Sequence, residues 1–362
     1  MSEGAAGSLE PWRIRDPETV PVARGEFEHL SGRDGVLAAG GWLHAPGGEA
    51  PDSFALYVGS ALAAVVPPVP RPDVKASFSH AVADERLGFL AAAFAGGAPP
   101  EGFHRIHVVG FEGPRPIGRT STVFTPGFAD GLPVPPERLV YRVSNSKSID
   151  VFRLGGLRTA GDFVSALRRH ADAAGSTRIL DWGCGCGRVS AFFLKYLEFF
   201  RSGSLTGCDI DPEGVEWCAR NLPGGRFVAI RPEPPTPFEA GEFDAICGYS
   251  VMTHLDRNRQ MAWIRELKRC LRPGGLLAVS VHGESAARYA ARRDLVARLS
   301  ERGIVDEIDD PNLDGVAPEG YYRETYQSRA WTEANWGREL KVLEYAERGM
   351  GGFQDLVVLR KG

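Results

Sequence analysis

The sequence lacks a long apolar segment and a run of basic residues. No apolar stretch approaches the roughly 18 residues that a membrane-spanning helix needs, and residues 1–9 have neither the basic nor the apolar region of a signal peptide. The 42 basic and 46 acidic residues give a formal net charge of −4, which argues against a partner held through the phosphates of a nucleic acid. We therefore expect a soluble, cytoplasmic protein with no membrane insertion and no nucleic-acid partner.

Cysteine is scarce and confined to one half of the chain. The six cysteines are Cys184, Cys186, Cys208, Cys218, Cys247 and Cys270. They do not form the disulfide pattern of a secreted protein, and Cys184-x-Cys186 lacks the second Cys or His pair of a zinc site. We therefore expect no metal, and we interpret the cysteines as small apolar residues.

The most informative segment present is Asp181-Trp182-Gly183-Cys184-Gly185-Cys186-Gly187, which follows the apolar run 178–180. It predicts a tight turn between a buried strand and a helix over residues 188–200, with backbone N–H groups facing a ligand of negative charge. The dinucleotide fingerprint requires a third glycine where this chain has Arg188. A different nucleoside-type cofactor is therefore expected, and an ordinary strand-to-helix turn is the alternative.

A second strand over 204–208 ends at Asp209-Ile210-Asp211-Pro212, about 20 residues after the glycines. A carboxylate at this point can accept hydrogen bonds from both hydroxyls of a ribose. Asp209 lies directly at the strand end and is the candidate for this role. Asp211 precedes Pro212, so we expect it to cap the helix that runs to Asn221.

Strand and helix continue to alternate. Further strands are predicted over 226–230, 243–247 and 276–281. Between the last two, Met261, Ile264, Leu267 and Leu271 recur at helical spacing, and Pro273-Gly274-Gly275 ends that helix. This alternation is typical of an α/β fold.

The Asp-x-Gly-x-Gly-x-Gly spacing resembles the first motif of class I S-adenosylmethionine-dependent methyltransferases. Residues 243–246, 250–255 and 271–275 match later motifs of that family in order and spacing. The resemblance covers about residues 150–362. It implies a Rossmann-like domain whose seven-stranded sheet is parallel except for an antiparallel C-terminal hairpin, formed here by 340–343 and 355–359 around a Gly-rich turn.

The resemblance also implies S-adenosylmethionine as the cofactor. Its methionine carboxylate and amino group would lie along the glycines, with Asp181 holding the amino end. The residues expected to bind the cofactor are Asp181, Gly183, Cys184, Gly185, Gly187, Asp209, Ile210, Glu233 and Ser250.

Two features depart from the family pattern. Many members place an Asp against the adenine amino group after the third strand, whereas this chain has Arg231-Pro232-Glu233-Pro234-Pro235, so Glu233 or backbone groups would take that role. Residues 284–327 form an insert longer than a crossover helix. We expect an amphipathic helix over 286–302 and a loop-like segment with exposed aromatics over 308–322, which ends at Tyr321-Tyr322. The insert is either a lid over the acceptor or a structural flap.

Candidates for the chemistry at the acceptor follow the fourth and fifth strands. Methyl transfer from a sulfonium is an in-line displacement that positioning and desolvation accelerate, but a hydroxyl acceptor also needs a base. His254 could be that base. Alternatively, His254 caps or orients the following helix with Asp256 as its partner. Tyr249 and His282 are the candidate substrate contacts, and Ser250 is a further acceptor-side candidate.

The first third of the chain differs in character. Residues 25–124 are rich in glycine, proline and short apolar runs, which predicts a small β-sandwich. The segments 71–76 and 87–89 resemble an Ig-like accessory domain of glycosyltransferases and methyltransferases in bacterial surface-polysaccharide pathways. Arg71 and Asp73 either pin a loop or contact a ligand. Residues 1–24 are interpreted as a flexible N-terminus, 125–149 as a linker, 141–169 as lead-in helices and 150–362 as the methyltransferase domain.

The sequence thus predicts a two-domain S-adenosylmethionine-dependent methyltransferase that acts on oxygen of a sugar or glycoconjugate intermediate. Its acceptor would be a small molecule or a glycan, and the sugar follows only from the resemblance. One alternative is an N- or C-methyltransferase of a small metabolite. Another is a glycan-binding or scaffold protein with a vestigial methyltransferase fold, against which the intact Asp181, glycines and Asp209 argue. The oligomeric state is not indicated.

Overall fold

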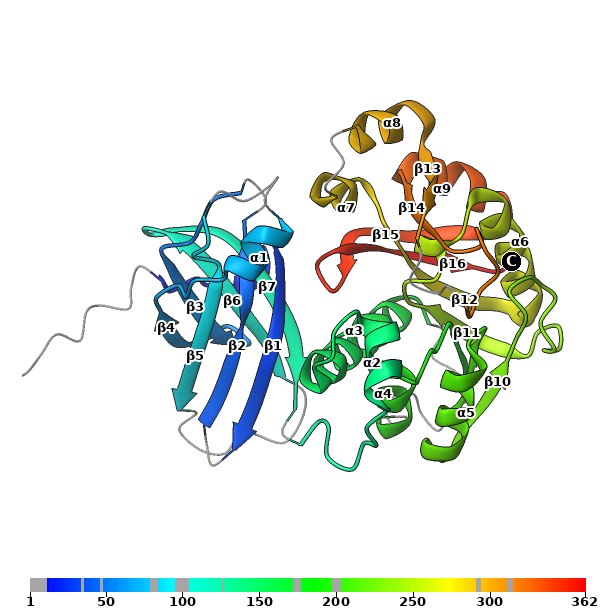
Figure 1. The fold of residues 1–362 in the computed structure, drawn as a ribbon, viewed down its shortest axis with the longest axis horizontal. Coiled ribbons are helices and arrows are strands. Elements are labelled where there is room, and N and C mark those ends of the chain that lie inside the picture. The colour runs from blue at the N-terminus through cyan, green and yellow to red at the C-terminus, as the bar shows by residue number, and fades with distance from the viewer. Residues whose placement is uncertain are drawn as a thin grey trace, which may run out of the picture. The chain divides into compact units, whose positions relative to one another are not determined.

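The computed structural model describes residues 12–33, 36–45, 48–78, 84–94, 104–125, 127–171, 177–196, 203–290, 294–310 and 315–362. The chain divides into two compact units, residues 1–130 and 131–362 (Figure 1). The division falls inside the segment 125–149 that the sequence assigns to a linker. Part of that segment is helical, because α2 spans Glu137–Ser144.

The N-terminal unit contains two antiparallel sheets (Figure 1). One has the order β4 (Ala61–Val66), β3 (Ser53–Val58), β6 (His104–Glu112) and β7 (Arg115–Phe124), and the other the order β1 (Arg24–Arg33), β2 (Val36–His44) and β5 (Gly88–Phe94). Short helical turns lie at η2 (Pro17–Thr19) and α1 (Pro72–Ser77). Strands were predicted here, and the sandwich arrangement and its Ig-like class stay predictions.

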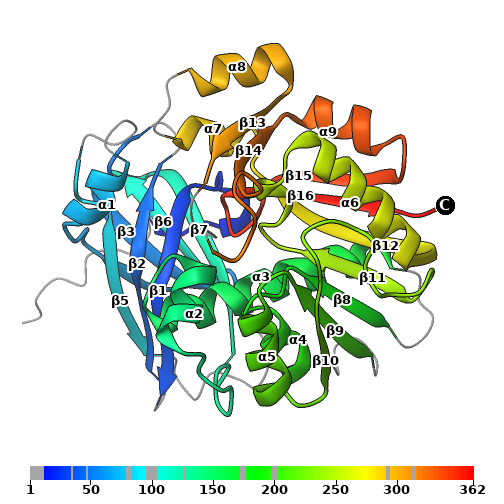
Figure 2. The ribbon, with the colours of Figure 1, turned by 45° about the vertical axis from the view of Figure 1, so that its right-hand side comes forward.

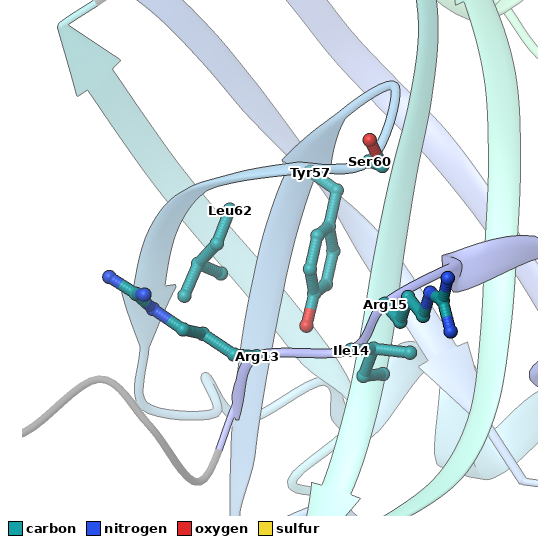
Figure 3. Close-up of a pocket in the computed structure, with 6 residues that line it drawn as sticks. All are labelled: Arg13, Ile14, Arg15, Tyr57, Ser60 and Leu62. Carbon is teal, nitrogen blue, oxygen red and sulfur yellow. The ribbon is translucent and has the colours of Figure 1, made fainter.

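Residues 12–24 pack on this unit, although the sequence assigns them to a flexible N-terminus. The indole N–H of Trp12 donates to Ser53 Oγ at 3.0 Å, and Val22 forms a parallel bridge with Arg119. A surface pocket of about 420 Å³ lies beside this segment (Figure 3). It is lined by Arg13, Ile14, Arg15, Tyr57, Ser60 and Leu62.

Arg71 pins a loop in this unit. Its guanidinium donates two hydrogen bonds to Asp73, at 2.8 and 2.6 Å, and two to Glu28, at 2.7 and 2.9 Å. The hydrogen bonds from Arg71 lower the pKa of Asp73 to about 2. These contacts fit the loop-pinning interpretation of this motif.

The C-terminal unit is built on a seven-stranded sheet of order β10–β9–β8–β11–β12–β16–β15 (Figure 2). The strands are β8 (Arg178–Trp182), β9 (Ser204–Asp209), β10 (Gly225–Ala229), β11 (Phe243–Gly248), β12 (Leu271–Val281), β15 (Lys341–Met350) and β16 (Gln354–Arg360). β8 to β12 are parallel, and β16 is antiparallel to both β12 and β15. The predicted Rossmann-like sheet with an antiparallel C-terminal hairpin is confirmed.

Helices cover the sheet, with α6 and α9 on one face and α3, α4 and α5 on the other (Figure 2). The helices of this unit are α2, α3 (Ile149–His170), α4 (Ser190–Lys195), α5 (Pro212–Asn221), η4 (Met252–His254), α6 (Arg257–Cys270), α7 (Glu284–Tyr289), α8 (Leu295–Arg302) and α9 (Arg329–Trp336). In the described part of the chain, no helix has the length and apolar character to cross a membrane.

Helix α6 shows how the sequence produces these layers. Asp256 caps its first turn by accepting two backbone N–H groups, and Trp263, Ile264 and Leu267 are buried against the central core. The chain then enters β12 at Leu271, earlier than the predicted strand.

The insert after β12 differs from the prediction. In place of one helix over 286–302 it contains α7 and α8. Strands β13 (Ile304–Asp309) and β14 (Arg323–Gln327) pair antiparallel and lie at the two ends of the segment 308–322 that was expected to be a loop. Tyr321, expected to be exposed, is only 4% exposed, and its hydroxyl donates to the backbone oxygen of Pro232. Charged residues interrupt the apolar pattern of β13, so the sequence gives only a weak strand signal there.

Candidate active site

The glycine loop, residues 183–187, lies at the carboxyl end of β8. Gly183, Gly185 and Gly187 have φ angles of +80°, +53° and +80°, a region that other residues rarely adopt. A Cβ on Gly183 would lie 2.2 Å from a methyl group of Val251. The spacing of the three glycines is therefore a requirement of the backbone.

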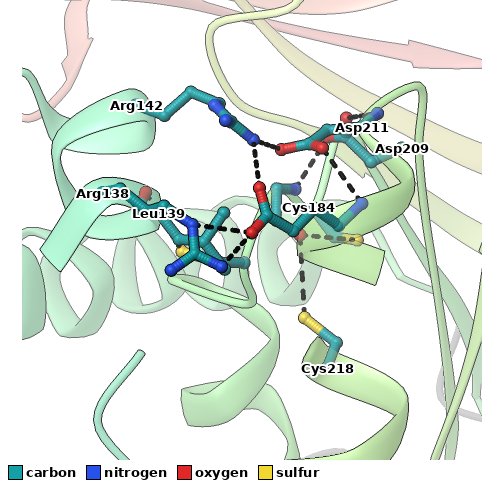
Figure 4. Close-up of polar contacts among 10 residues, drawn as sticks. Arg138, Leu139, Arg142, Cys184, Asp209, Asp211 and Cys218 are labelled. Carbon is teal, nitrogen blue, oxygen red and sulfur yellow. Dashed lines mark hydrogen bonds and ion pairs between the residues drawn. The ribbon is translucent and has the colours of Figure 1, made fainter. Parts of the chain in front are cut away.

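Asp209 anchors this loop from the neighbouring strand β9. Its Oδ2 accepts the Gly185 N–H at 2.7 Å, and its Oδ1 accepts the Asp211 N–H at 2.8 Å (Figure 4). Burial raises the pKa of Asp209, and these two N–H bonds oppose that rise. A carboxylate oxygen has further lone pairs, so Asp209 can still accept ribose hydroxyls. The arrangement fits the nucleoside part of the expected cofactor.

Asp181 is a buried carboxylate at the start of the loop, with 1% of its surface exposed. Its Oδ2 accepts a hydrogen bond from Ser190 Oγ at 2.5 Å, and burial raises its pKa to about 6. A desolvated carboxylate gains from a cationic partner. Asp181 therefore fits the ammonium group of the cofactor's methionine.

Helix α2 closes over the loop (Figure 4). Arg142 donates to Asp211 Oδ2 at 2.5 Å, and Arg138 donates to Glu213. Asp211 also accepts the Glu213 N–H at 3.1 Å, which confirms it as the cap of α5. This helix overlaps both the predicted linker over 125–149 and the predicted lead-in helices over 141–169, and no role was predicted for its arginines. The helical spacing of its apolar residues was the signal that could have found it.

The residues predicted to bind the cofactor also include Cys184, Ile210 and Glu233. Cys184 is buried within the loop, and Ile210 packs against the central core. Glu233, on the loop after β10, pairs with Arg259 of α6 at 2.8 Å. An adenine-binding role for Glu233 stays a prediction.

A polar cluster forms where β11 and β12 end and β16 begins. It consists of Ser250, His254, His282 and Gln354. Ser250 Oγ lies 3.4 Å from His254 Nε2, and Gln354 Nε2 lies 3.0 Å from Ser250 Oγ and 3.4 Å from His282 Nε2. Ser250 has a φ of +60°, and its N–H donates to Ser280 Oγ at 2.8 Å. No role was predicted for Gln354, because it belongs to no motif and lies 104 residues from Ser250 in the chain.

His254 is held by the insert. Its Nδ1 lies 3.0 Å from the backbone oxygen of Arg323 and 3.4 Å from Asp310 Oδ2, and the ring of Tyr322 stacks on it with centroids 4.0 Å apart. Because a carbonyl only accepts, Nδ1 carries a hydrogen, which leaves Nε2 of the neutral ring free to accept a proton. The capping alternative is wrong, since Asp256 itself caps α6.

Tyr322 covers the ring of His254 from the insert. Burial raises its pKa, and the carboxylates of Asp310 and Asp209 raise it further. This position fits the lid interpretation of the insert. Tyr249 is a predicted substrate contact. The Cζ atom of Arg188 lies over its ring, 5.0 Å from the ring centroid.

Comparison with known proteins agrees with this geometry. Residues 179–275 match the family model described as a methyltransferase domain. The match covers β8 to the start of β12, including the glycine loop, Asp209 and His254. It confirms the predicted S-adenosylmethionine-dependent methyltransferase domain.

Relatives match over part of their length. The chain is 34% identical over 110 residues to a probable phthiotriol/phenolphthiotriol dimycocerosates methyltransferase 2 of Mycobacterium ulcerans, covering 30% of this chain and 40% of that protein. It is 31% identical over 149 residues to a ubiquinone biosynthesis O-methyltransferase of Xanthomonas oryzae, covering 39% of this chain and 58% of that protein. The chain thus spans less than two thirds of these relatives.

Among solved structures, the fold aligns with 1,6-didemethyltoxoflavin-N1-methyltransferase of Burkholderia thailandensis, crystallised with S-adenosylhomocysteine. The identity is 16% and the TM-score 0.41, over 67% of this chain and 95% of that one.

Proposed function

We propose that the whole protein is an S-adenosylmethionine-dependent methyltransferase that methylates a hydroxyl oxygen of a sugar or glycoconjugate intermediate. The observation that carries the cofactor assignment is the loop of three left-handed glycines between the carboxylates of Asp181 and Asp209. When bound, the cofactor supplies an electrophilic methyl group on a sulfonium. Asp181 would hold its ammonium group, Asp209 its ribose, and the backbone of the glycine loop its methionine carboxylate.

His254 supports oxygen as the methylated atom. Its Nδ1 is bonded to the insert, so Nε2 is the ring atom that can take up a proton when the acceptor loses one. A hydroxyl needs this assistance, whereas a neutral amine attacks without first losing a proton. His254 on the acceptor side therefore favours O-methylation over the N-methyltransferase alternative.

The acceptor class rests on the resemblance of the N-terminal unit and on charge. The related proteins are named for lipid, quinone and tRNA methylation, so they do not agree on an acceptor. The net charge of −4 disfavours tRNA. Arg13 and Arg15 flank the pocket in Figure 3, which suits an anionic sugar derivative docked on the N-terminal unit.

The experiment is label transfer. The protein is incubated with S-adenosylmethionine carrying a labelled methyl group and with separate fractions of cell-envelope precursors, total tRNA and soluble metabolites. We expect alkali-stable label in the sugar-containing envelope fraction and no label with Gly185→Val. Label that enters only tRNA or only a metabolite amine contradicts the proposed acceptor.

A further inference from the structure

Gln354 fixes the direction of the hydrogen bonds in the polar cluster. A glutamine amide nitrogen only donates. Its Nε2 lies 3.0 Å from Ser250 Oγ and 3.4 Å from His282 Nε2, so both of these atoms act as acceptors. For His282 this places the hydrogen of the neutral ring on Nδ1. For Ser250 it occupies one of two lone pairs.

The hydrogen of Ser250 has a matching acceptor in His254. Because Nδ1 of His254 donates to the Arg323 carbonyl, its Nε2 carries a lone pair, and that atom lies 3.4 Å from Ser250 Oγ. Hydrogen bonds of catalytic groups are often this long before the acceptor binds. The hydroxyl of Ser250 can therefore donate to His254 Nε2, and its second lone pair is left for a third group; Thr253 Oγ1, at 3.2 Å, is the other described partner within reach.

Gln354 shows that this cluster is incomplete without a ligand. The residue is 5% exposed, and its Oε1 is buried with no hydrogen-bond partner in the part of the chain that the structure describes. Buried polar atoms of native proteins are nearly always paired. A hydroxylated acceptor would supply the missing donor.

We propose that Ser250 relays the acceptor proton to His254, and that Gln354 is the positioning residue that sets the direction of the relay. This inference rests on the proposed O-methyl transfer. The acceptor hydroxyl donates to the remaining lone pair of Ser250 Oγ. As the acceptor oxygen bonds to the methyl carbon, the carbon–sulfur bond breaks and its electron pair stays on sulfur.

The protons move in the same step. The acceptor proton passes to Ser250 Oγ, and the proton of Ser250 passes to His254 Nε2. His254 becomes an imidazolium beside Asp310 and later releases the proton to water. Thr253 Oγ1 lies 3.2 Å from Ser250 Oγ and is the other described hydroxyl within reach. In the proposed complex, the acceptor hydroxyl replaces Thr253 as the donor to the second lone pair of Ser250 Oγ.

The direction of the hydrogen bonds can be measured without turnover. Full-length protein with ¹⁵N-labelled histidine reports ring tautomers by NMR. We expect His254 and His282 to carry their hydrogens on Nδ1. In Gln354→Glu the carboxylate only accepts, so the hydrogen of His282 should move to Nε2. A wild-type His282 with its hydrogen on Nε2 overturns the proposal, whether or not any acceptor is methylated.

Kinetics test the relay itself, with the envelope fraction that gains label as acceptor. Ser250→Ala and Gln354→Glu should each lower kcat at least tenfold, with little change in the KM for S-adenosylmethionine and in the melting temperature. Thr253→Val is the matched control and should keep the wild-type kcat. A wild-type kcat in Ser250→Ala overturns the relay. Absence of label in every fraction contradicts the proposed function. The histidine tautomers still decide the direction of the hydrogen bonds in the cluster.

Discussion

The backbone of Gly185 lies so close to Val143 that a Cβ at position 185 would be 2.7 Å from the Val143 Cγ2 atom. Gly185 is at the middle of the glycine loop, and Val143 is on α2. Gly185 is therefore constrained in two ways. Its backbone is left-handed, and it is covered by α2, which lies outside residues 179–275 that match the methyltransferase family model. The proposed cofactor site therefore depends on the loop and on α2 together.

Gly185→Val should weaken S-adenosylhomocysteine binding at least tenfold, because the side chain strains the loop and pushes α2 away. The left-handed backbone alone costs about 1–2 kcal/mol for a residue with a Cβ. Gly59 is a matched control, since its φ is +58° and a Cβ there has no atom within 4 Å. Gly59→Val should carry the same strain and bind normally in calorimetry. Unchanged affinity in Gly185→Val would contradict the loop assignment.

Asp181→Asn should stabilise the cofactor-free protein at neutral pH. The folded pKa of Asp181 is raised from 3.8 to about 6, so its contribution to stability is full at acid pH and is lost as the pH rises through 6. Removing the charge should add about 2–3 kcal/mol to the free energy of unfolding at pH 7.5 and little at pH 4. Urea unfolding at both pH values measures this difference.

The same substitution should weaken S-adenosylmethionine binding, because the ammonium group loses its carboxylate. Asp209→Asn is the contrasting variant. Both oxygens of Asp209 accept backbone N–H groups, so an amide NH₂ at one of them should destabilise the loop at either pH. If the free energy of unfolding depended on pH equally in Asp181→Asn and in the wild type, the role of the buried charge would be refuted.

His254→Ala should lower kcat by about 10²–10⁴-fold, the usual contribution of a general base, with little change in cofactor affinity. Asp256→Ala is the control for the helix: it should lower stability by about 1 kcal/mol and leave kcat unchanged. A wild-type kcat in His254→Ala rules out the base.

Arg142→Met should weaken cofactor binding, because the ion pair between Arg142 and Asp211 holds α2 over the loop. Asp211 has 8% of its side chain exposed, so losing its partner should also cost about 1 kcal/mol of stability. Lys147→Met breaks an exposed pair next to the same helix and should change neither quantity. Equal affinities for the two variants would show that α2 is held by its apolar face alone.

A fragment of residues 131–362 should bind S-adenosylhomocysteine with near wild-type affinity, since it contains every residue of the proposed cofactor site. If the N-terminal unit docks a glycan, this fragment should lose turnover on the envelope fraction. Turnover equal to that of the full chain would remove the docking role.

Local pattern determined the order of elements in the C-terminal unit. Glycines that need a left-handed backbone, a carboxylate at each of two strand ends and apolar runs of strand length are all readable within a few residues of sequence. They predicted the strands and the Asp211 cap, while the resemblance to the methyltransferase family implied the parallel sheet and the hairpin; the structure confirms these predictions. The β13–β14 pair was missed because its charged residues interrupt the alternation, and the pairing is decided by a partner strand.

The sequence by itself determined the glycine loop and the place of Asp209 at a strand end, because these depend on short-range backbone geometry, and its motifs indicated the methyltransferase domain by resemblance. Only the tertiary structure decided what surrounds them. It brought α2 over Gly185, placed the Arg323 carbonyl and Tyr322 against His254, and set Gln354 beside Ser250 across 104 residues of chain. Such contacts join distant segments through packing and hydrogen-bond direction, and no local spacing encodes them.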